Sequence, residues 1–230
     1  MKAVIGLQLM LIGVCCGLKS SCVAMHDGVK CYGSLGGTLH IQLMADASKI
    51  PYFKWTKSRS VLLRWMAKKT VTRIRDSRFN FFPRNGTVRI TNLKMDDTGL
   101  YKLDLISENG KYNGSKTLQL YVEAPVSSAR LVSKCASLGK QRVFCFSEAG
   151  DNTWYEWTLD GKPLKGFENM YGDILASTIL LKPKTTGRLV CSIRNHISHS
   201  FKEMKLTSCV TGGRKKIRLA LDETVPKKSL

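Results

Sequence analysis

Alternating hydrophobic and polar positions recur in short runs along the first half of the chain. The clearest runs are GGTLHIQL, YFKW, SVLLRWMA, RFNFFPRNGTVRITNL and KYNGSKTLQLYVEA. A period of two residues is the pattern of a β-strand with one buried and one exposed face. Asn109 and Gly110 separate two such runs, and an Asn-Gly pair in that place predicts a hairpin turn. The first half is therefore predicted to be all-β.

The second half of the chain places two cysteine pairs one inside the other. Trp157 follows Cys145, Cys191 comes later, and Cys135 and Cys209 enclose all three. A Cys…Trp…Cys spacing among short strands is the signature of an immunoglobulin sandwich, whose bridge pins two sheets together beside the tryptophan. The spacing predicts an inner bridge Cys145–Cys191 and an outer bridge Cys135–Cys209.

The first half has the marks of a variable-type immunoglobulin domain, which contains about nine strands. Its DTGLY motif ends at Tyr101, which in such domains bonds back to the backbone, and Arg78 is the natural partner of Asp97. Leu43 and Leu103 stand where this domain usually has its two cysteines. The sequence thus predicts two tandem immunoglobulin-like sandwiches: a variable-type one lacking its disulfide, then a constant-type one with two nested disulfides. The residues predicted to be structural are Trp55, Arg78, Asp97, Tyr101 and Trp157.

Four segments follow from these patterns: a signal peptide at 1–24, a variable-type domain at 25–123, a constant-type domain at 129–210, and a basic disordered tail at 211–230. Removal of the signal peptide leaves an odd number of cysteines. Cys31 is then free, pairs with Cys22 if cleavage falls earlier, or bridges two chains. No hydrophobic run after Cys209 could span a membrane, so we expect a secreted or extracellular protein, membrane-anchored only in a longer isoform.

The formal net charge of +20 is strongly positive. Such a charge favours nucleic acid in general, but an extracellular, disulfide-bonded chain is expected to meet acidic protein surfaces or anionic glycans instead. Several basic residues lie on or between the strands expected to form the front sheet of the first domain. Those predicted to contact a partner are Lys54, Lys57, Arg59, Arg64, Lys102 and Lys111.

Asn85 and Asn113 begin glycosylation sequons in predicted turns, and both are predicted to be modified. Enzymatic chemistry has little support. His196 and His199 could suggest a metal pair but lack a nearby third ligand, so we expect no metal and no cofactor. No phosphate-binding loop or nucleophile motif occurs, so the chain is not predicted to be an enzyme.

Taken together, the phrase FFPRNGTVRITNLKMDDTGLYKLDL, the missing first bridge, the short linker and the nested bridges resemble the SLAM family of lymphocyte adhesion receptors. The likeness covers about residues 36–209 and is closer to the family's short two-domain counter-receptors. It implies recognition in the immune system: the front sheet of domain 1 would bind a protein counter-receptor on leukocytes, itself a related immunoglobulin-domain protein. This chain departs from the family by lacking an anchor, so a soluble form is expected. The alternative is a secreted basic glycan-binding protein.

Overall fold

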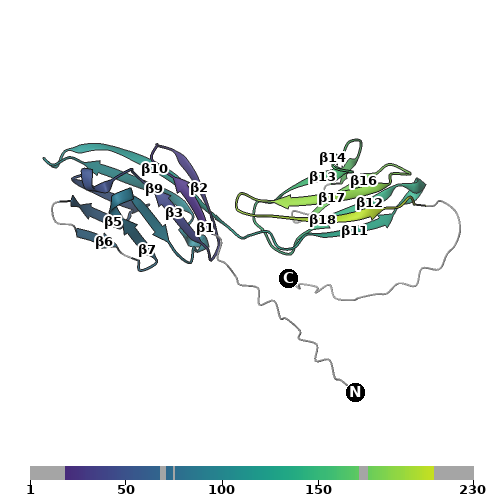
Figure 1. The fold of residues 1–230 in the computed structure, drawn as a ribbon, viewed down its shortest axis with the longest axis horizontal. Coiled ribbons are helices and arrows are strands. Elements are labelled where there is room, and N and C mark those ends of the chain that lie inside the picture. Colours follow the sequence, from purple (N-terminus) through teal and green to yellow (C-terminus); the bar gives the residue numbers. More distant parts are fainter. Residues whose placement is uncertain (1–18, 68–70, 75, 171–175, 210–230) are drawn as a thin grey trace, which may run out of the picture. The chain divides into compact units, whose positions relative to one another are not determined.

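The computed structural model describes residues 19–67, 71–74, 76–170 and 176–209, and its regular structure is almost entirely β (Figure 1). The chain divides into two compact units. The first unit runs to Ala129 and takes in Ser147–Glu156 and Ser192–Phe201; the second holds Arg130–Phe146, Trp157–Cys191 and the chain from Lys202 onward. Most of the expected signal peptide and the expected basic tail lie outside the described residues.

Residues 19–123 form a sandwich of two sheets, which we call the first sandwich. Its back sheet has the order β1 (Lys19–Val23), β3 (Thr38–Gln42), β8 (Thr87–Ile90), β7 (Phe79–Phe82). Its front sheet has the order β2 (Val29–Ser34), β10 (Tyr112–Glu123), β9 (Gly99–Ile106), β4 (Tyr52–Lys57), β5 (Ser60–Met66), β6 (Val71–Ile74). Short 3₁₀ helices η1 (Ala47–Lys49), η3 (Pro83–Asn85) and η4 (Met95–Asp97) connect strands.

The core of the first sandwich comes from the alternation seen in the sequence. Leu39 and Ile41 of β3 and Ile90 of β8 are fully buried from the back sheet, and they meet Phe53 and Trp55 of β4 from the front sheet. Each fully buried side chain of this size stabilises the fold by about 1.5–3 kcal/mol relative to exposure. The hydrophobic face of each sheet is thereby covered by the other, which fixes the register of both.

The N-terminal strand changes the disulfide pattern that the sequence predicts. β1 pairs in parallel with β3 in the back sheet, whereas β2 pairs in parallel with β10 in the front sheet. Cys22 of β1 and Cys31 of β2 form a disulfide that joins the two sheets across this switch. The prediction of no bridge in the first sandwich is therefore wrong. Leu43 and Leu103, which the sequence analysis places at the usual cysteine positions, are both buried.

The same strand lies inside the segment 1–24 that is expected to be a signal peptide. Residues 19–23 are a paired strand, and the Ala24 amide donates to the Gln42 carbonyl at 2.8 Å. Cleavage after Ala24 would remove β1 together with Cys22. Of the three fates considered for Cys31, the structure shows the pairing with Cys22.

The second half of the chain forms two further sheets. One has the order β11 (Arg130–Cys135), β12 (Gln141–Phe146), β16 (Ala176–Leu181), β15 (Glu168–Met170). The other has the order β14 (Lys162–Pro163), β13 (Trp154–Leu159), β17 (Gly187–Arg194), β18 (His199–Leu206). The 3₁₀ helix η5 (Ser137–Gly139) joins β11 to β12.

Both disulfides predicted for the second half are present. Cys145 bridges to fully buried Cys191, and Cys135 bridges to Cys209. Trp157 is buried, and its indole N–H donates to Ser177 Oγ at 3.2 Å. The inner bridge closes a loop of 46 residues, and its loss would cost about 4 kcal/mol in the chain-entropy model.

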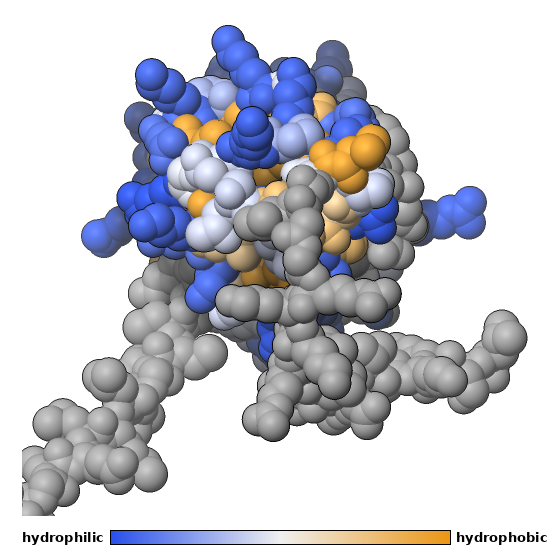
Figure 2. All heavy atoms as spheres, turned by 90° about the vertical axis from the view of Figure 1, so that its right-hand side faces the viewer, coloured by the Kyte–Doolittle hydropathy of each residue, from blue (hydrophilic) through white to orange (hydrophobic). Residues whose placement is uncertain are grey.

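Figure 2 shows one face of the molecule, where hydrophilic side chains surround a few hydrophobic ones. Among the described residues, no helix is long and apolar enough to cross a membrane. Exposed hydrophobic side chains that neighbour one another across paired strands are candidates for a binding surface.

Candidate functional site

The outer face of the front sheet carries most of the candidate binding residues. Phe53 and Trp55 of β4 are fully buried, so the intervening Lys54 points away from the core. On β9 the same alternation buries Leu103 and exposes Lys102. β4 pairs with β9 in antiparallel register, which brings the outward side chains of the two strands together.

Three cations and one carboxylate form the centre of this face. Lys54 Nζ lies 3.4 Å from Asp104 Oδ2, and Lys102 Nζ lies 2.9 Å from Asp104 Oδ1. The Asp104 side chain is only 8% exposed, whereas the side chains of the two lysines are 40% and 48% exposed. The hydrogen bond to Asp104 and the charge of that carboxylate raise the pKa of Lys102. Arg64 is exposed and stands opposite Lys54 in the β4–β5 register. We call Lys54, Arg64 and Lys102 the cationic cluster.

An apolar row borders the cationic cluster. Tyr52 of β4 pairs with Met66 of β5 on one side and with Ile106 of β9 on the other, and Ile106 pairs with Tyr112 of β10. These four side chains therefore form one continuous line across four strands, which we call the apolar row. Met66 is 37% exposed and Tyr112 is 63% exposed. The cationic cluster lies beside this row: Lys54 and Arg64 are each two residues from it along β4 and β5, and Lys102 is two residues beyond Asp104 along β9.

Sequence reasoning missed the apolar row. Its members belong to separate runs of the sequence, and each looks like an ordinary strand residue on its own. Alternation within a strand could have shown that Tyr52 lies on the same face as Lys54. Only the pairing register, however, shows that the four residues are neighbours.

The other three predicted cations are not part of the cationic cluster. The Lys57 ammonium donates to the Asp96 backbone carbonyl, and it also lies over the Tyr101 ring at 5.7 Å from its centroid. Lys57 therefore helps to hold η4 against β4, a structural task. Arg59 is exposed in the turn between β4 and β5, at the opposite end of these strands from the apolar row. Lys111 is exposed in the β9–β10 hairpin, next to Tyr112.

A charged corner formed around Asp97 holds the start of β9, which follows η4 directly. Arg78 makes two hydrogen bonds to the Asp97 carboxylate, at 2.7 and 2.9 Å, and the Tyr101 hydroxyl donates to the Asp97 carbonyl at 2.7 Å. Burial raises the pKa of Asp97. The hydrogen bonds from Arg78 and from the Lys94 amide, together with the Arg78 charge, lower this pKa by more than burial raises it, so the net shift is downward. The corner predicted from the DTGLY motif is thus present, and Trp55 stacks on Tyr101 with centroids 4.9 Å apart.

Both predicted glycosylation sites are exposed. Asn85 ends the 3₁₀ helix η3, and Gly86 after it has a left-handed backbone (φ 56°). A Cβ at Gly86 would lie 2.3 Å from the Met44 carbonyl oxygen, which is why only glycine fits this turn. Asn113 lies in β10 beside Tyr112, where the β9–β10 register is irregular. A glycan at Asn113 would border the apolar row.

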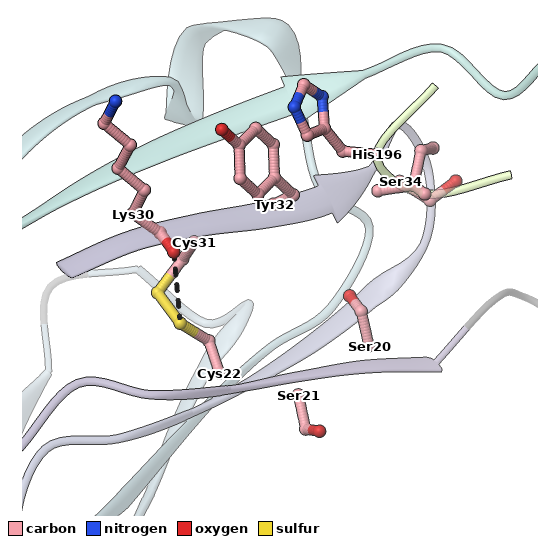
Figure 3. A pocket seen from close by; sticks show the side chains of 9 residues that line it. Ser20, Ser21, Cys22, Lys30, Cys31, Tyr32, Ser34 and His196 are labelled. Carbon is pink, nitrogen blue, oxygen red and sulfur yellow. Dashed lines mark hydrogen bonds between the residues drawn. A yellow bond between two sulfur atoms is a disulfide. The ribbon is translucent and has the colours of Figure 1, made fainter. Parts of the chain in front are cut away.

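A small hollow of about 320 Å³ lies in the first unit, lined by Ser20, Ser21, Cys22, Lys30, Cys31, Tyr32, Ser34, His196 and Ile197. Figure 3 shows the Tyr32 and His196 rings face to face, with centroids 3.8 Å apart. His196 Nδ1 also lies 2.9 Å from Oε1 of the buried Glu123. The dashed contact from Cys22 Sγ to the Lys30 carbonyl is 3.9 Å long; the sulfur cannot donate there, because a bridged sulfur carries no proton.

His196 thus has neighbours of an ordinary structural kind. Within the ranges that the structure describes, no group of three or more His, Cys, Asp or Glu side chains could hold a metal ion. The hollow combines serine hydroxyls with Lys30 and His196, and the His196 ring is engaged with Glu123 and stacked on Tyr32. The outer face of the front sheet therefore remains the best candidate for a functional site.

The comparisons with known proteins agree with this fold. Residues 31–123 match the family model of the immunoglobulin V-set domain. Over 78% of this chain and 98% of the other, the structure aligns with that of murine CEACAM1b at a TM-score of 0.64 and 16% sequence identity, a likeness of fold. The first sandwich thus matches an immunoglobulin V-set domain over residues 31–123, and the predicted all-β immunoglobulin-like fold is confirmed.

Two curated human relatives are similar in sequence. The hepatic and glial cell adhesion molecule is 27% identical over 145 residues, covering 58% of this chain and 35% of the relative. HEPACAM family member 2 is 26% identical over 211 residues, covering 84% of this chain and 45% of the relative. The chain therefore spans less than half the length of these relatives. The similarity is to adhesion molecules of the immunoglobulin class, and it does not single out the SLAM family.

Proposed function

We propose that this chain is an extracellular recognition protein that binds a protein counter-receptor through the outer face of the front sheet of its first sandwich. One observation carries the proposal: a continuous row of partly exposed apolar side chains lies directly beside the cationic cluster on that face. Protein interfaces combine buried aromatic and aliphatic anchors with charged groups that steer and orient the partner. The apolar row and the cationic cluster supply both.

The V-set domain and the adhesion relatives support a recognition role over an enzymatic one. The finer features of the proposal come from the sequence. They are a likeness to the short counter-receptors of the SLAM family, a related immunoglobulin-domain partner on leukocytes, and a soluble form. We also propose a signal peptide that ends before Lys19, since β1 belongs to the sandwich, and N-glycans at Asn85 and Asn113.

The experiment measures binding of the fluorescently labelled protein to a panel of leukocytes. Tyr112→Ser and Arg64→Glu each change one exposed residue of the candidate face and should weaken cell binding at least about tenfold, as hot-spot changes do. Lys134→Glu in β11 is a matched control, because Lys134 is also exposed and contributes the same charge change as Arg64→Glu. Equal loss from Lys134→Glu, or none from Tyr112→Ser, would contradict the proposed surface.

An anionic glycan is the second candidate ligand, and the net charge of +20 favours it. The apolar row, however, favours a partner that buries apolar side chains, and Lys54 and Lys102 are already paired with Asp104, which leaves them less available to sulfate groups. Retention on a heparin column separates the two. Elution at modest salt, unchanged by Tyr112→Ser, fits protein recognition. Retention to high salt that Arg64→Glu abolishes would favour the glycan.

A further inference from the structure

We infer that the front face rejects a second copy of this chain and accepts a different protein that presents carboxylates opposite the cationic cluster and an apolar side chain against the apolar row. The inference rests on the proposed function and specifies the partner's chemistry. It commits to heterophilic rather than homophilic binding at this face.

The charges of the face are arranged to disfavour self-pairing. Among the described outward residues in the rows of the cationic cluster, Asp104 is the one carboxylate, and it is buried and already neutralised by Lys54 and Lys102. Arg64 stands beside them with its side chain exposed. The group therefore keeps a positive formal charge, and its carboxylate is already engaged. At the nearby hairpin, Glu108 and Lys111 are both exposed and cancel in formal charge.

Two identical faces would meet through a two-fold axis, so that each residue contacts its own kind or a neighbour of the same face. Cation would then oppose cation across a partly desolvated interface, where like charges are most unfavourable. A partner with carboxylates at those positions converts the same contact into attraction. Either a second copy of this chain or a different protein would bury the apolar row, so the charge opposite the cationic cluster decides which of the two binds.

The ion-pair geometry suggests a probe made from the chain itself. The inverted variant carries four substitutions: Lys54→Glu, Arg64→Glu, Lys102→Glu and Asp104→Lys. Residue 104 then carries the positive charge and residues 54 and 102 the negative charges, so the opposite-charge contacts are kept with their signs reversed. Its face presents the carboxylates that the inferred partner must have. Mixed with the wild-type chain, it tests whether complementary charge is sufficient to let the apolar rows associate.

Sedimentation velocity measures association of wild type alone, the inverted variant alone, and the mixture, after enzymatic removal of N-glycans. We expect the mixture to associate at least about tenfold more tightly than either protein with itself. Raising the salt from about 0.05 to about 0.5 M should weaken the mixture and leave the wild type monomeric. Tyr112→Ser in the wild-type partner should abolish the association.

The control variant Lys134→Glu with Arg142→Glu changes the net charge by the same amount as the inverted variant. Both residues are exposed, and they pair with each other between β11 and β12. If this control associates with wild type as tightly as the inverted variant does, attraction is diffuse and the inference fails. It also fails if the wild type dimerises on its own and Tyr112→Ser abolishes the dimer, because a second copy is then the occupant.

A milder variant keeps the test valid if the inverted chain does not fold. Lys54→Gln with Arg64→Gln leaves Lys102 paired with Asp104 and removes the excess charge. Self-association should then become at least about tenfold tighter than that of the wild type. A variant that stays as monomeric as the wild type would overturn the inference. The proposed function would survive that result if Tyr112→Ser still weakened binding to leukocytes.

Discussion

Asp97→Ala tests the charged corner formed by Arg78, Asp97 and Tyr101 at the start of β9. The Asp97 side chain is 9% exposed and accepts two hydrogen bonds from Arg78 and one, at 2.8 Å, from the Lys94 amide. Alanine removes all three acceptor contacts. The hydrogen bond from the Tyr101 hydroxyl remains, because its acceptor is the Asp97 backbone carbonyl.

Breaking a buried ion pair by removing one partner costs about 3–5 kcal/mol, since the other charge is left in a poorly solvated place. Here Arg78 keeps partners: its Nη2 lies 2.8 Å from Asp76 Oδ2, and its Nη1 donates to the Asn92 carbonyl at 3.0 Å. The guanidinium side chain is also 19% exposed, so water can reach part of it. We therefore expect the lower end of the range, about 3 kcal/mol of unfolding free energy.

Urea unfolding followed by tryptophan fluorescence measures this loss. Asp97→Asn keeps the shape and one acceptor, and should cost less, about 2 kcal/mol, since it removes the charge from the hydrogen bonds to Arg78. Asp96→Ala is the matched control, because Asp96 is the preceding residue of η4 and is exposed. Its effect should stay within about 0.5 kcal/mol. A loss below about 1 kcal/mol for Asp97→Ala, or an equal loss for Asp96→Ala, would refute the reasoning.

Three further predictions concern the first sandwich. Replacing Cys22 and Cys31 together by alanine should lower the unfolding free energy by about 2.6 kcal/mol in the chain-entropy model, since the bridge spans 9 residues. Non-reducing peptide mapping of the wild type should show this bridge, and a free Cys31 thiol would contradict the prediction. Tyr101→Phe should cost about 1–2 kcal/mol in the same urea assay, because the buried hydroxyl gives up a 2.7 Å hydrogen bond and leaves a carbonyl unpaired; an unchanged midpoint would show that the corner bond contributes nothing. The pKa of Asp97 is lower in the folded chain than in the unfolded chain. The stability that this carboxylate contributes is therefore full above about pH 4, and it is lost as the pH falls through the pKa of Asp97 in the folded chain. When unfolding is followed as the pH is lowered, the Asp97→Asn variant should lack this loss of stability.

Much of the fold was predictable because its signals are residue types at characteristic spacings. The nested cysteines with Trp157 and the DTGLY motif are patterns typical of immunoglobulin sandwiches, and the bridges and the corner that they predict are present. Alternation along β4 correctly places Lys54 on the outer face. The start of the first sandwich was not predictable in this way. The apolar run at the N-terminus ends at Leu18, and β1 begins with the polar residues Lys19, Ser20 and Ser21. Local composition alone does not show that this short segment pairs with β3 as a strand of the back sheet.

The candidate site was predicted only in part. Among the six cations proposed from sequence, Lys54, Arg64 and Lys102 are neighbours on one face. Lys57 instead bonds to the Asp96 carbonyl. Charge and strand position suggested the same role for each of them. The difference arises from η4, which the fold brings to the end of β4 from a place 39 residues further along the chain.

Residue types at a fixed spacing were enough to establish the all-β class, the two nested bridges and the charged corner. Three other features depend on distant segments meeting, so they emerge only once the chain has folded. Cys31 pairs with Cys22 because β1 and β2 enter opposite sheets. Asp104 is neutralised because β4 and β9 pair in a register that sets it between two lysines. The apolar row exists because four strands align Tyr52, Met66, Ile106 and Tyr112, and a shift of one residue in any pairing would turn its members to the other face.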